Sequence, residues 1–387
     1  MEEQFTPKKS RTENSRRDWL KASGIALIGS TLVSKAESTP KVTATAPPSP
    51  QNPVRMMYNE NPLPPSPEMR KAMQQALDEV NTYSHFRVLA EVKERLAERE
   101  GVSPSQIIVG AGSTEVLRVT ALQLLHDLPI DRRRVVALSP GYEGMNRYAE
   151  QMGAQIERVP VKEDFSPNLA HLSAEVKKGA ALLNLCNPNN PTGVIVPKEK
   201  LTPFCQEMAQ ETFVFVDEAY HEFVTYPNYG SMLPLVKNGH RVMVTRTFSK
   251  LFGLSGIRIG YGIAQAELVT ELEAAQTGTV NIVALRSALA GLKDKHFQKA
   301  SLANNVASKE ILVSELTKLG HKFAPGEGNF IFFHTGIPIE QFQEKMLAKG
   351  FRVGRPFPPY LDWCRLSLST PENMHLFCKA LHQVLSS

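Results

Sequence analysis

The side chain best placed for covalent chemistry is Lys250, which lies in the segment TRTFSKLFGLSGIRIGYG at residues 245–262. It follows a short apolar run, 242–245, that predicts a strand, and it precedes a glycine-rich stretch. In an α/β sheet, the end of such a strand faces a ligand crevice. A lysine desolvated there has a lowered pKa and becomes a nucleophile for carbonyl groups. A single lysine is more often an exposed loop residue, so the neighbouring motifs must decide between the two interpretations.

Two further strand ends carry polar groups of a complementary kind. Asp217 closes the apolar run FVFVD, where a carboxylate is unfavourable unless it has a partner such as a protonated pyridine nitrogen. Taken alone, Asp217 is explained equally well as a helix N-cap or a surface acid. The segment NPNNPTG at 187–193 follows the predicted strand 181–185 and offers the amide of Asn190, although these residues also suit an ordinary turn.

A fourth strand end supplies groups that suit an anion. The stretch GAGSTE at 110–115 lies between a predicted strand and a predicted helix, so its backbone N–H groups and the hydroxyls of Ser113 and Thr114 would face an anion at a helix N-terminus. It is not G-x-G-x-x-G, so dinucleotide binding is not predicted. Arg258 would add a cation to the same phosphate. Because parallel strands end at one edge of a sheet, these groups together with Lys250 and Asp217 predict a site for pyridoxal 5′-phosphate (PLP).

Four motifs in this order resemble those of the fold-type I aminotransferases: NENP at 59–62, NPNNPTG at 187–193, DEAY at 217–220, and TFSK at 247–250 with the later Arg258. Within that superfamily the chain is most similar to the histidinol-phosphate aminotransferase group, from about residue 57 to near the C-terminus. The resemblance implies an enzyme that uses PLP to pass an amino group from an amino acid or a related amine to a 2-oxo acid.

The resemblance also implies a cofactor role for individual residues. Lys250 would hold the cofactor covalently and move the substrate proton, Asp217 would pair with the pyridine nitrogen, and Asn190 and Tyr220 would contact the phenolic oxygen. Tyr142 would stack on the ring. The residues implied to hold the phosphate are Ser113, Thr114, Thr247, Ser249 and Arg258, together with Tyr83 from a neighbouring subunit. That last role implies a homodimer. One departure is Thr114, which stands where the family has aspartate in its G-S-D-E turn.

For the substrate, the resemblance implies that Arg365 clamps the α-carboxylate and that Asn59 and Asn329 line the pocket. Arg355 is the candidate for contacting the distal part of the substrate, with Arg352 as an equal alternative. The same cofactor site would also serve a racemase, a decarboxylase, a β-lyase or an amine oxidase, because a fold does not fix a reaction. A third hypothesis is a binding protein that retains the cofactor fold without catalysis.

The architecture expected around these motifs is α/β. Short apolar runs at 106–109, 135–138, 181–185, 213–216, 242–245 and 257–263 alternate with helical patterns, which indicates a mostly parallel sheet. Long amphipathic helices and two strand-like segments follow residue 290. We therefore expect a large PLP-binding domain at 81–289 and a smaller α+β domain at 54–80 and 290–387, in the arrangement of the PLP-dependent transferase fold type I.

The N-terminal region predicts export rather than fold. Arg16-Arg17 precede a mildly apolar run, 22–33, and the small-x-small pattern Ser34-Lys35-Ala36. This order is typical of a signal peptide, and the paired arginines resemble the twin-arginine type. We expect a signal peptide at 1–36, a flexible linker at 37–53 and a periplasmic protein, or a cytoplasmic one if the leader does not function. Because histidine synthesis is cytoplasmic, the resemblance does not fix the substrate.

Composition excludes several other classes of function. Hydrophobic residues make up 42% and charged residues 21% of the 387, which is ordinary for a globular protein. A net charge of +5 does not suggest nucleic acid, and no apolar run is long enough for a membrane span. The start of an H-E-x-x-H motif at His221 fails because Thr225 stands at its last position, so no metal site is predicted.

Overall fold

The structure is a computed structural model, and it describes residues 47–385. The predicted signal peptide at 1–36 and most of the predicted linker lie outside the described residues. None of the helices within 47–385 is long and apolar enough to cross a membrane.

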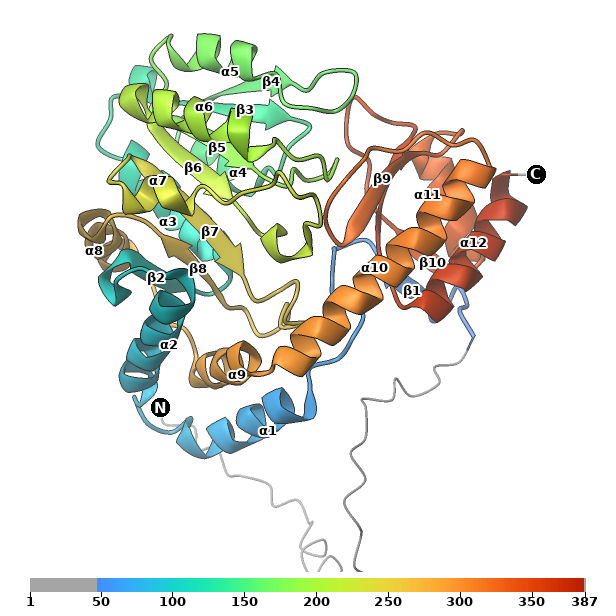
Figure 1. The fold of residues 1–387 in the computed structure, drawn as a ribbon, viewed down its shortest axis with the longest axis horizontal. Helices are drawn as coiled ribbons and strands as arrows, with labels where there is room; N and C mark the ends of the chain where they lie inside the picture. The colour runs from blue at the N-terminus through green and yellow to red at the C-terminus, as the bar shows by residue number, and fades with distance from the viewer. Residues whose placement is uncertain (1–46, 386–387) are drawn as a thin grey trace, which may run out of the picture. The chain divides into compact units, whose positions relative to one another are not determined.

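A seven-stranded sheet forms the centre of the described region (Figure 1), with the strand order β2-β8-β7-β6-β5-β3-β4. Its strands are β2 (Ile107–Gly110), β3 (Arg134–Ser139), β4 (Gln155–Pro160), β5 (Leu182–Cys186), β6 (Phe213–Asp217), β7 (Val242–Thr247) and β8 (Gly260–Ile263). Only β8 runs antiparallel to its neighbours β2 and β7. The prediction of an α/β fold with a mostly parallel sheet is confirmed.

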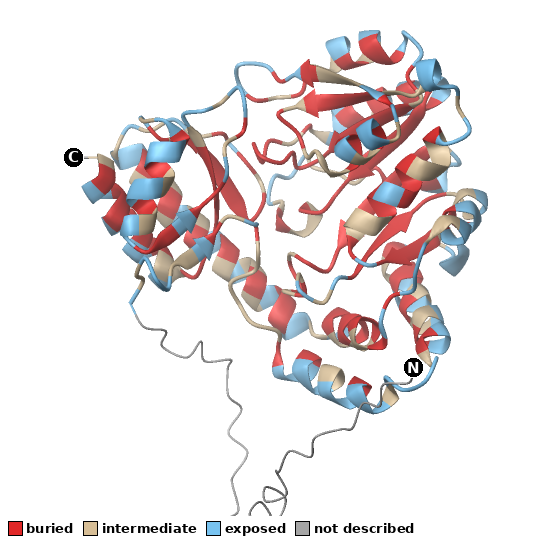
Figure 2. Cartoon of the chain, turned by 180° about the vertical axis from the view of Figure 1, so that it is seen from behind, coloured by how far each residue is buried: buried red, intermediate tan, exposed pale blue. Residues whose placement is uncertain are grey.

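Helices cover both faces of this sheet, which is why most of its strands are continuous apolar runs. In β6, Val214 and Val216 belong to one hydrophobic core, whereas Phe213 and Phe215 belong to the core on the other face. The first core is closed by α1 (Pro67–Ala76), α2 (His85–Glu100), α5 (Leu169–Val176), α6 (Lys198–Glu211), α7 (Leu233–Lys237) and α9 (Ile282–Lys293). The second is closed by α3 (Ser113–Leu125), α4 (Gly144–Gln151) and α8 (Ala266–Ala275). Figure 2 shows the strands buried and the outer helix faces exposed.

A third hydrophobic core joins the N-terminal strand to the C-terminal part of the chain. It contains two two-stranded sheets, one of parallel β1 (Val54–Met56) and β10 (Phe351–Val353), the other of antiparallel β9 (Phe330–His334) and β11 (Trp363–Ser367). The helices packed on them are α10 (Lys295–Lys318), α11 (Ile339–Ala348) and α12 (Pro371–Leu385). The predicted domain boundaries stay a prediction. Met69 of α1, which lies in the segment assigned to the small domain, belongs to the core of the large sheet.

Two elements depart from the apolar patterns in the sequence for identifiable reasons. Strand β4 lies at the edge of the sheet, and only one of its six residues is buried, so its sequence QIERVP shows no apolar run. Helix α10 starts at Lys295, where the Asp294 side chain accepts a hydrogen bond from the N–H of Phe297. Its first turns bury polar residues such as Gln298 and Ser301, which hides the apolar periodicity there.

Candidate active site

The predicted strand ends converge on one cavity of about 470 Å³ at the carboxyl edge of the sheet. Of the sequence-predicted site residues, thirteen line this cavity: Asn59, Ser113, Thr114, Tyr142, Asn190, Asp217, Tyr220, Thr247, Ser249, Lys250, Arg258, Arg355 and Arg365. Asp217, Thr247 and Arg365 lie within β6, β7 and β11, and Ser113 and Thr114 begin the helix that follows β2. The others lie in the loops after β3, β5, β6 and β7, or in segments beside β1, β8 and β10. The structure therefore brings together lysine, acid, amide and anion cradle, as the motifs predict.

Two predicted residues do not line the cavity. Asn329 is buried behind it, where its Nδ2 donates to the backbone oxygens of Asn59 at 2.9 Å and Glu60 at 3.3 Å. It thus supports the chain segment that forms the wall. Tyr83 is 88% exposed between α1 and α2 and takes no part in the cavity of its own chain. Its predicted role in a neighbouring subunit stays a prediction.

The phosphate end of the cavity is built at the N-terminus of α3, where Ser113 and Thr114 begin the helix. Gly112 precedes them with φ at +78°, a left-handed conformation that glycine adopts without strain. A Cβ on Gly112 would lie 2.3 Å from Nη2 of Arg258, so the guanidinium packs directly against this turn. Free N–H groups, hydroxyls and an arginine at a helix N-terminus form an anion site.

Asp217 is 4% exposed and lies at the end of β6. Its Oδ1 accepts from the N–H of Ala219 at 3.1 Å and from Oγ1 of Thr245 at 3.2 Å. No described residue donates to Oδ2, so that oxygen is available to a cationic N–H group. Burial raises the pKa of this carboxyl to about 6, against the lowering effect of the hydrogen bond from Thr245. A buried acid of this kind favours a cationic partner.

Tyr220 is held by two amides, because its hydroxyl oxygen accepts from Nδ2 of Asn59 at 3.0 Å and from Nδ2 of Asn190 at 3.2 Å. Both bonds use the oxygen as acceptor, so the hydroxyl proton is left to donate into the cavity. Burial raises the pKa of Tyr220, which keeps that proton in place at neutral pH. Asn59 itself is fully buried and has a φ of +53°, a conformation that asparagine tolerates better than most residues.

The amine of Lys250 is directed at the same wall of the cavity. Its Nζ donates to the backbone oxygens of Asn59 at 2.8 Å and Tyr58 at 3.1 Å. Burial, and to a lesser degree the charge of Arg365, lower the pKa of this amine from 10.5 to about 7. A large fraction of the amine is therefore neutral, and nucleophilic, near neutral pH.

Two arginines lie near the ring of Phe357 in the cavity wall. Arg365 is buried; its Nη1 donates to Oδ1 of Asn190 at 2.8 Å, and its Nη2 donates to the backbone oxygen of Met57. Its Nε has no hydrogen-bond partner among the residues that the structure describes. The guanidinium carbon of Arg355 lies 4.1 Å from the centre of the Phe357 ring, and that of Arg365 lies 5.2 Å from it. Arg352 lies in β10 beside Arg55 and is not part of the cavity.

Sequence reasoning missed several lining residues, namely Tyr58, Glu60, Gly141, Ala219, Ser255, Gly256 and Phe357. Most are immediate neighbours of predicted residues, and that proximity was the available signal. Phe357 follows Arg355 by two positions but gave no chemical cue of its own. Cys186 also lines the cavity, and burial raises the pKa of its thiol.

The side chains fit PLP at each of its polar ends. The arginine-backed helix N-terminus suits the phosphate, the free Oδ2 of Asp217 suits the pyridinium nitrogen, and Tyr220 and Asn190 present donors where a phenolic oxygen would lie. Lys250 supplies the amine for covalent attachment. Arg365 lines the cavity as well, and its buried Nε has no hydrogen-bond partner among residues 47–385.

Proteins similar to this chain are aminotransferases. The sequence matches the family described as "Aminotransferase class I and II" over residues 52–381. It is 34% identical over 337 residues to histidinol-phosphate aminotransferase of Moorella thermoacetica, which covers 86% of each chain. It is 34% identical over 335 residues to that of Symbiobacterium thermophilum, covering 86% of this chain and 90% of the other.

Solved structures show the same fold. A crystal structure of an Erwinia carotovora atroseptica protein superposes with a TM-score of 0.84 at 30% identity, covering 89% of this chain and 99% of the other. The PLP complex of histidinol-phosphate aminotransferase from Sinorhizobium meliloti has a TM-score of 0.79 at 24% identity, covering 91% and 98%. The predictions of an aminotransferase and of PLP as its cofactor are confirmed. The chain belongs to the aminotransferase class I and II family.

Proposed function

We propose that this aminotransferase takes its amino group from a donor that carries an anion close to the reacting amine, of the kind that histidinol phosphate represents. The observation that carries the proposal is Arg365, a buried guanidinium in the cavity wall whose Nε lacks a hydrogen-bond partner. Burial lowers the pKa of Arg365, a sign that its charge lacks a compensating anion. Phosphate and carboxylate both bind a planar guanidinium through paired hydrogen bonds.

A second cation favours a dianionic group or a second anion on the substrate. Arg355 lines the cavity, and its Nη1 donates only to the backbone oxygen of Pro356. Both guanidinium groups lie close to the ring of Phe357. A phosphate ester, or a dicarboxylic acid acting as the second substrate, would complement this pair. The relatives named above act on histidinol phosphate, which supports the phosphate ester.

We assign the reaction steps to groups of this chain as follows. Lys250 would hold the cofactor and would serve as the base that moves the proton of the substrate carbon; its pKa, lowered by burial to about 7, suits that role near neutral pH. When bound, PLP supplies the electron sink for this proton transfer. Asp217 keeps the pyridine nitrogen protonated, and Tyr220 donates its proton to the phenolic oxygen. Arg365 orients the substrate amine by holding the neighbouring anion.

The test compares histidinol phosphate with histidinol, which differ only in the phosphate. First-turnover product formation should be at least about tenfold faster with the phosphate ester, because charge-assisted hydrogen bonds are roughly twice as strong as neutral ones. Arg365→Lys, which keeps the charge but loses the planar fork, should reduce that preference. Equal rates with the two compounds would contradict the assignment of Arg365. Reaction with amino acids alone would show that the anion is a carboxylate.

We further propose that the enzyme is a homodimer with Tyr83 of each subunit at the other's site. Four large apolar residues, Leu77, Val80, Tyr83 and Phe86, are 60%, 59%, 88% and 64% exposed within ten consecutive positions. Such a patch is typical of an interface. Mixing subunits that carry Tyr83→Ala with subunits that carry Lys250→Ala should restore one complete site per dimer. A protein that is monomeric by light scattering would refute the proposal.

Export by the twin-arginine route is proposed on the sequence of residues 14–36 alone. In fractionated cells, the full chain should appear in the periplasm, and Arg16→Lys with Arg17→Lys should retain it in the cytoplasm. A periplasmic enzyme would not meet biosynthetic histidinol phosphate, so this result also decides whether that compound or another anionic amine is the donor in the cell.

A further inference from the structure

Glu218 and Arg246, the residues after Asp217 and Thr245, form a separate set of buried contacts. Thr245 and Arg246 are consecutive residues of β7, so their side chains leave the sheet on opposite faces. Thr245 bonds to Asp217, whereas Arg246 bonds to Glu218, the residue after Asp217. Asp217 and Thr245 therefore bond on one face of the sheet, and Glu218 and Arg246 form an ion pair on the other face.

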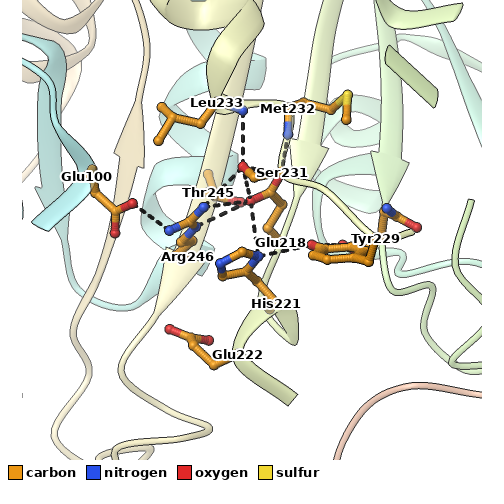
Figure 3. Close-up of polar contacts among 12 residues, drawn as sticks. Glu100, Glu218, His221, Glu222, Tyr229, Ser231, Met232, Leu233, Thr245 and Arg246 are labelled. Carbon is orange, nitrogen blue, oxygen red and sulfur yellow. Dashed lines mark hydrogen bonds and ion pairs between the residues drawn. The ribbon is translucent and has the colours of Figure 1, made fainter. Parts of the chain in front are cut away.

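Arg246 lies between two carboxylates (Figure 3). Its Nη2 donates to Oε2 of Glu218 at 3.0 Å and its Nη1 to Oε2 of Glu100, at the end of α2, at 2.6 Å. Arg246 is 4% exposed and Glu218 is 1% exposed. Burial alone would lower the pKa of Arg246, but Glu218, Tyr261 and Glu100 outweigh it and raise that pKa. The arginine is therefore a permanent cation in a dry, fully bonded setting.

Glu218 is fixed by further donors beyond Arg246. Its two oxygens accept from Oγ of Ser231 at 2.9 and 2.7 Å, and Oε1 accepts from the N–H of Met232 at 2.8 Å. The backbone N–H of Glu218 donates to the oxygen of Thr245 at 2.9 Å. With both side chain and main chain held, residue 218 has little freedom, and neither has Asp217 before it.

His221 joins this network to the loop that carries Asn190, because its backbone N–H donates to the oxygen of Glu218 at 3.0 Å. The hydroxyl of Tyr229 donates to the backbone oxygen of Asn187 at 3.2 Å and lies 3.2 Å from Nδ1 of His221. Because the Tyr229 proton goes to Asn187, Nδ1 of His221 carries the proton in the other bond. The backbone N–H of Asn187 in turn donates to the oxygen of Asp217 at 3.0 Å.

A buried ion pair contributes little net stability compared with well-packed apolar side chains, because the desolvation of both charges offsets their attraction. What such a pair does supply is fixed geometry, and misplacement of a catalytic group by about 1 Å can slow a reaction 100-fold. We propose that Arg246 and Glu218 are a positioning pair, which fixes the ends of β6 and β7 and thereby aims the Asp217 carboxylate at the cofactor nitrogen. The proposal rests on the assignment of Asp217 to that nitrogen.

The test is a double-mutant cycle on cofactor affinity, measured by titrating cofactor-free protein with PLP and following the absorbance of the bound form. Glu218→Gln keeps the shape and the bonds from Ser231 and Met232 but removes the charge. It should weaken PLP binding about tenfold, since a charge-assisted bond is replaced by a neutral one. In an Asp217→Asn background, the same change should have little effect. Arg246→Lys, which keeps the charge but loses the fork, should act in the same direction as Glu218→Gln.

The control is Glu175→Gln, which removes the charge of a buried carboxylate that pairs with Nη2 of the partly buried Arg134 at 2.6 Å, outside the cavity. It should leave PLP affinity unchanged. Additive effects of Glu218→Gln and Asp217→Asn would overturn the proposal, as would an unchanged affinity in Glu218→Gln or an equal loss in the control. If Asp217→Asn alone left PLP affinity unchanged, the assignment of Asp217 would be the part at fault.

Discussion

Replacing Lys250 with methionine in the cofactor-free protein should stabilise the fold at neutral pH, and the gain should shrink as the pH rises. The folded amine has a pKa of about 7, lowered from 10.5 by burial and by the charge of Arg365. Between these two values, the unfolded chain binds more protons than the folded one. The wild-type protein therefore gains stability as the pH rises through this window, and below it the cost of the charged lysine is constant.

The size of the effect follows from the same two values. For each pH unit below 10.5, the buried lysine lowers the free energy of unfolding by about 1.4 kcal/mol, until the folded amine is itself protonated below about pH 7. The cost is thus about 4 kcal/mol near pH 7 and about 2 kcal/mol near pH 9. Methionine also loses the two hydrogen bonds to the backbone oxygens of Tyr58 and Asn59, but that loss does not depend on pH. The advantage of Lys250→Met should therefore fall by about 2 kcal/mol between these pH values.

The assay is urea unfolding of both cofactor-free proteins at several pH values and one protein concentration, followed by circular dichroism. Lys71→Met, at an exposed position on α1, is the matched control and should follow the wild-type curve. Acylation of Lys250 in the folded protein, measured by peptide mass spectrometry, should reach half its maximal rate near pH 7. A stability difference between wild type and Lys250→Met that stays flat across the window would refute the reasoning.

Three further predictions concern the cofactor end of the cavity. Asp217→Asn should weaken PLP binding, which a PLP titration near pH 8 measures. The same change should stabilise the cofactor-free protein above about pH 6 by up to about 3 kcal/mol, because the buried carboxylate is charged there. Urea unfolding near pH 8 measures this second effect. Gly112→Ala should lower PLP affinity with little change in donor preference, since the new Cβ would displace Arg258 and strain a positive φ by about 1–2 kcal/mol. Tyr220→Phe should lower the free energy of unfolding by about 1–3 kcal/mol, because two buried amides lose their acceptor, and should slow turnover as well; unchanged stability would show that these amides find other partners.

The sequence by itself determined the sheet and the chemistry at its edge. Both faces of the sheet are covered, so strands such as β5, β6 and β7 are short apolar runs that end abruptly in polar motifs. Because parallel strands share one edge, Asp217, Asn190 and Lys250 could be placed together without knowing any contact between them. The edge strand β4 escaped the same reasoning because its exposed face removes the apolar signal.

Only the tertiary structure decided how the wall opposite Asp217 is built. Asn59 lies 161 positions from Tyr220 and Arg365 lies 175 positions from Asn190, yet each pair is joined by a hydrogen bond. The structure also places Arg355 in the cavity and Arg352 outside it, although both stand in the same five-residue segment FRVGR at 351–355. Local spacing fixes which face of one element a residue occupies. Contacts between distant elements depend instead on how the cores pack, as they do for Glu218 and Arg246.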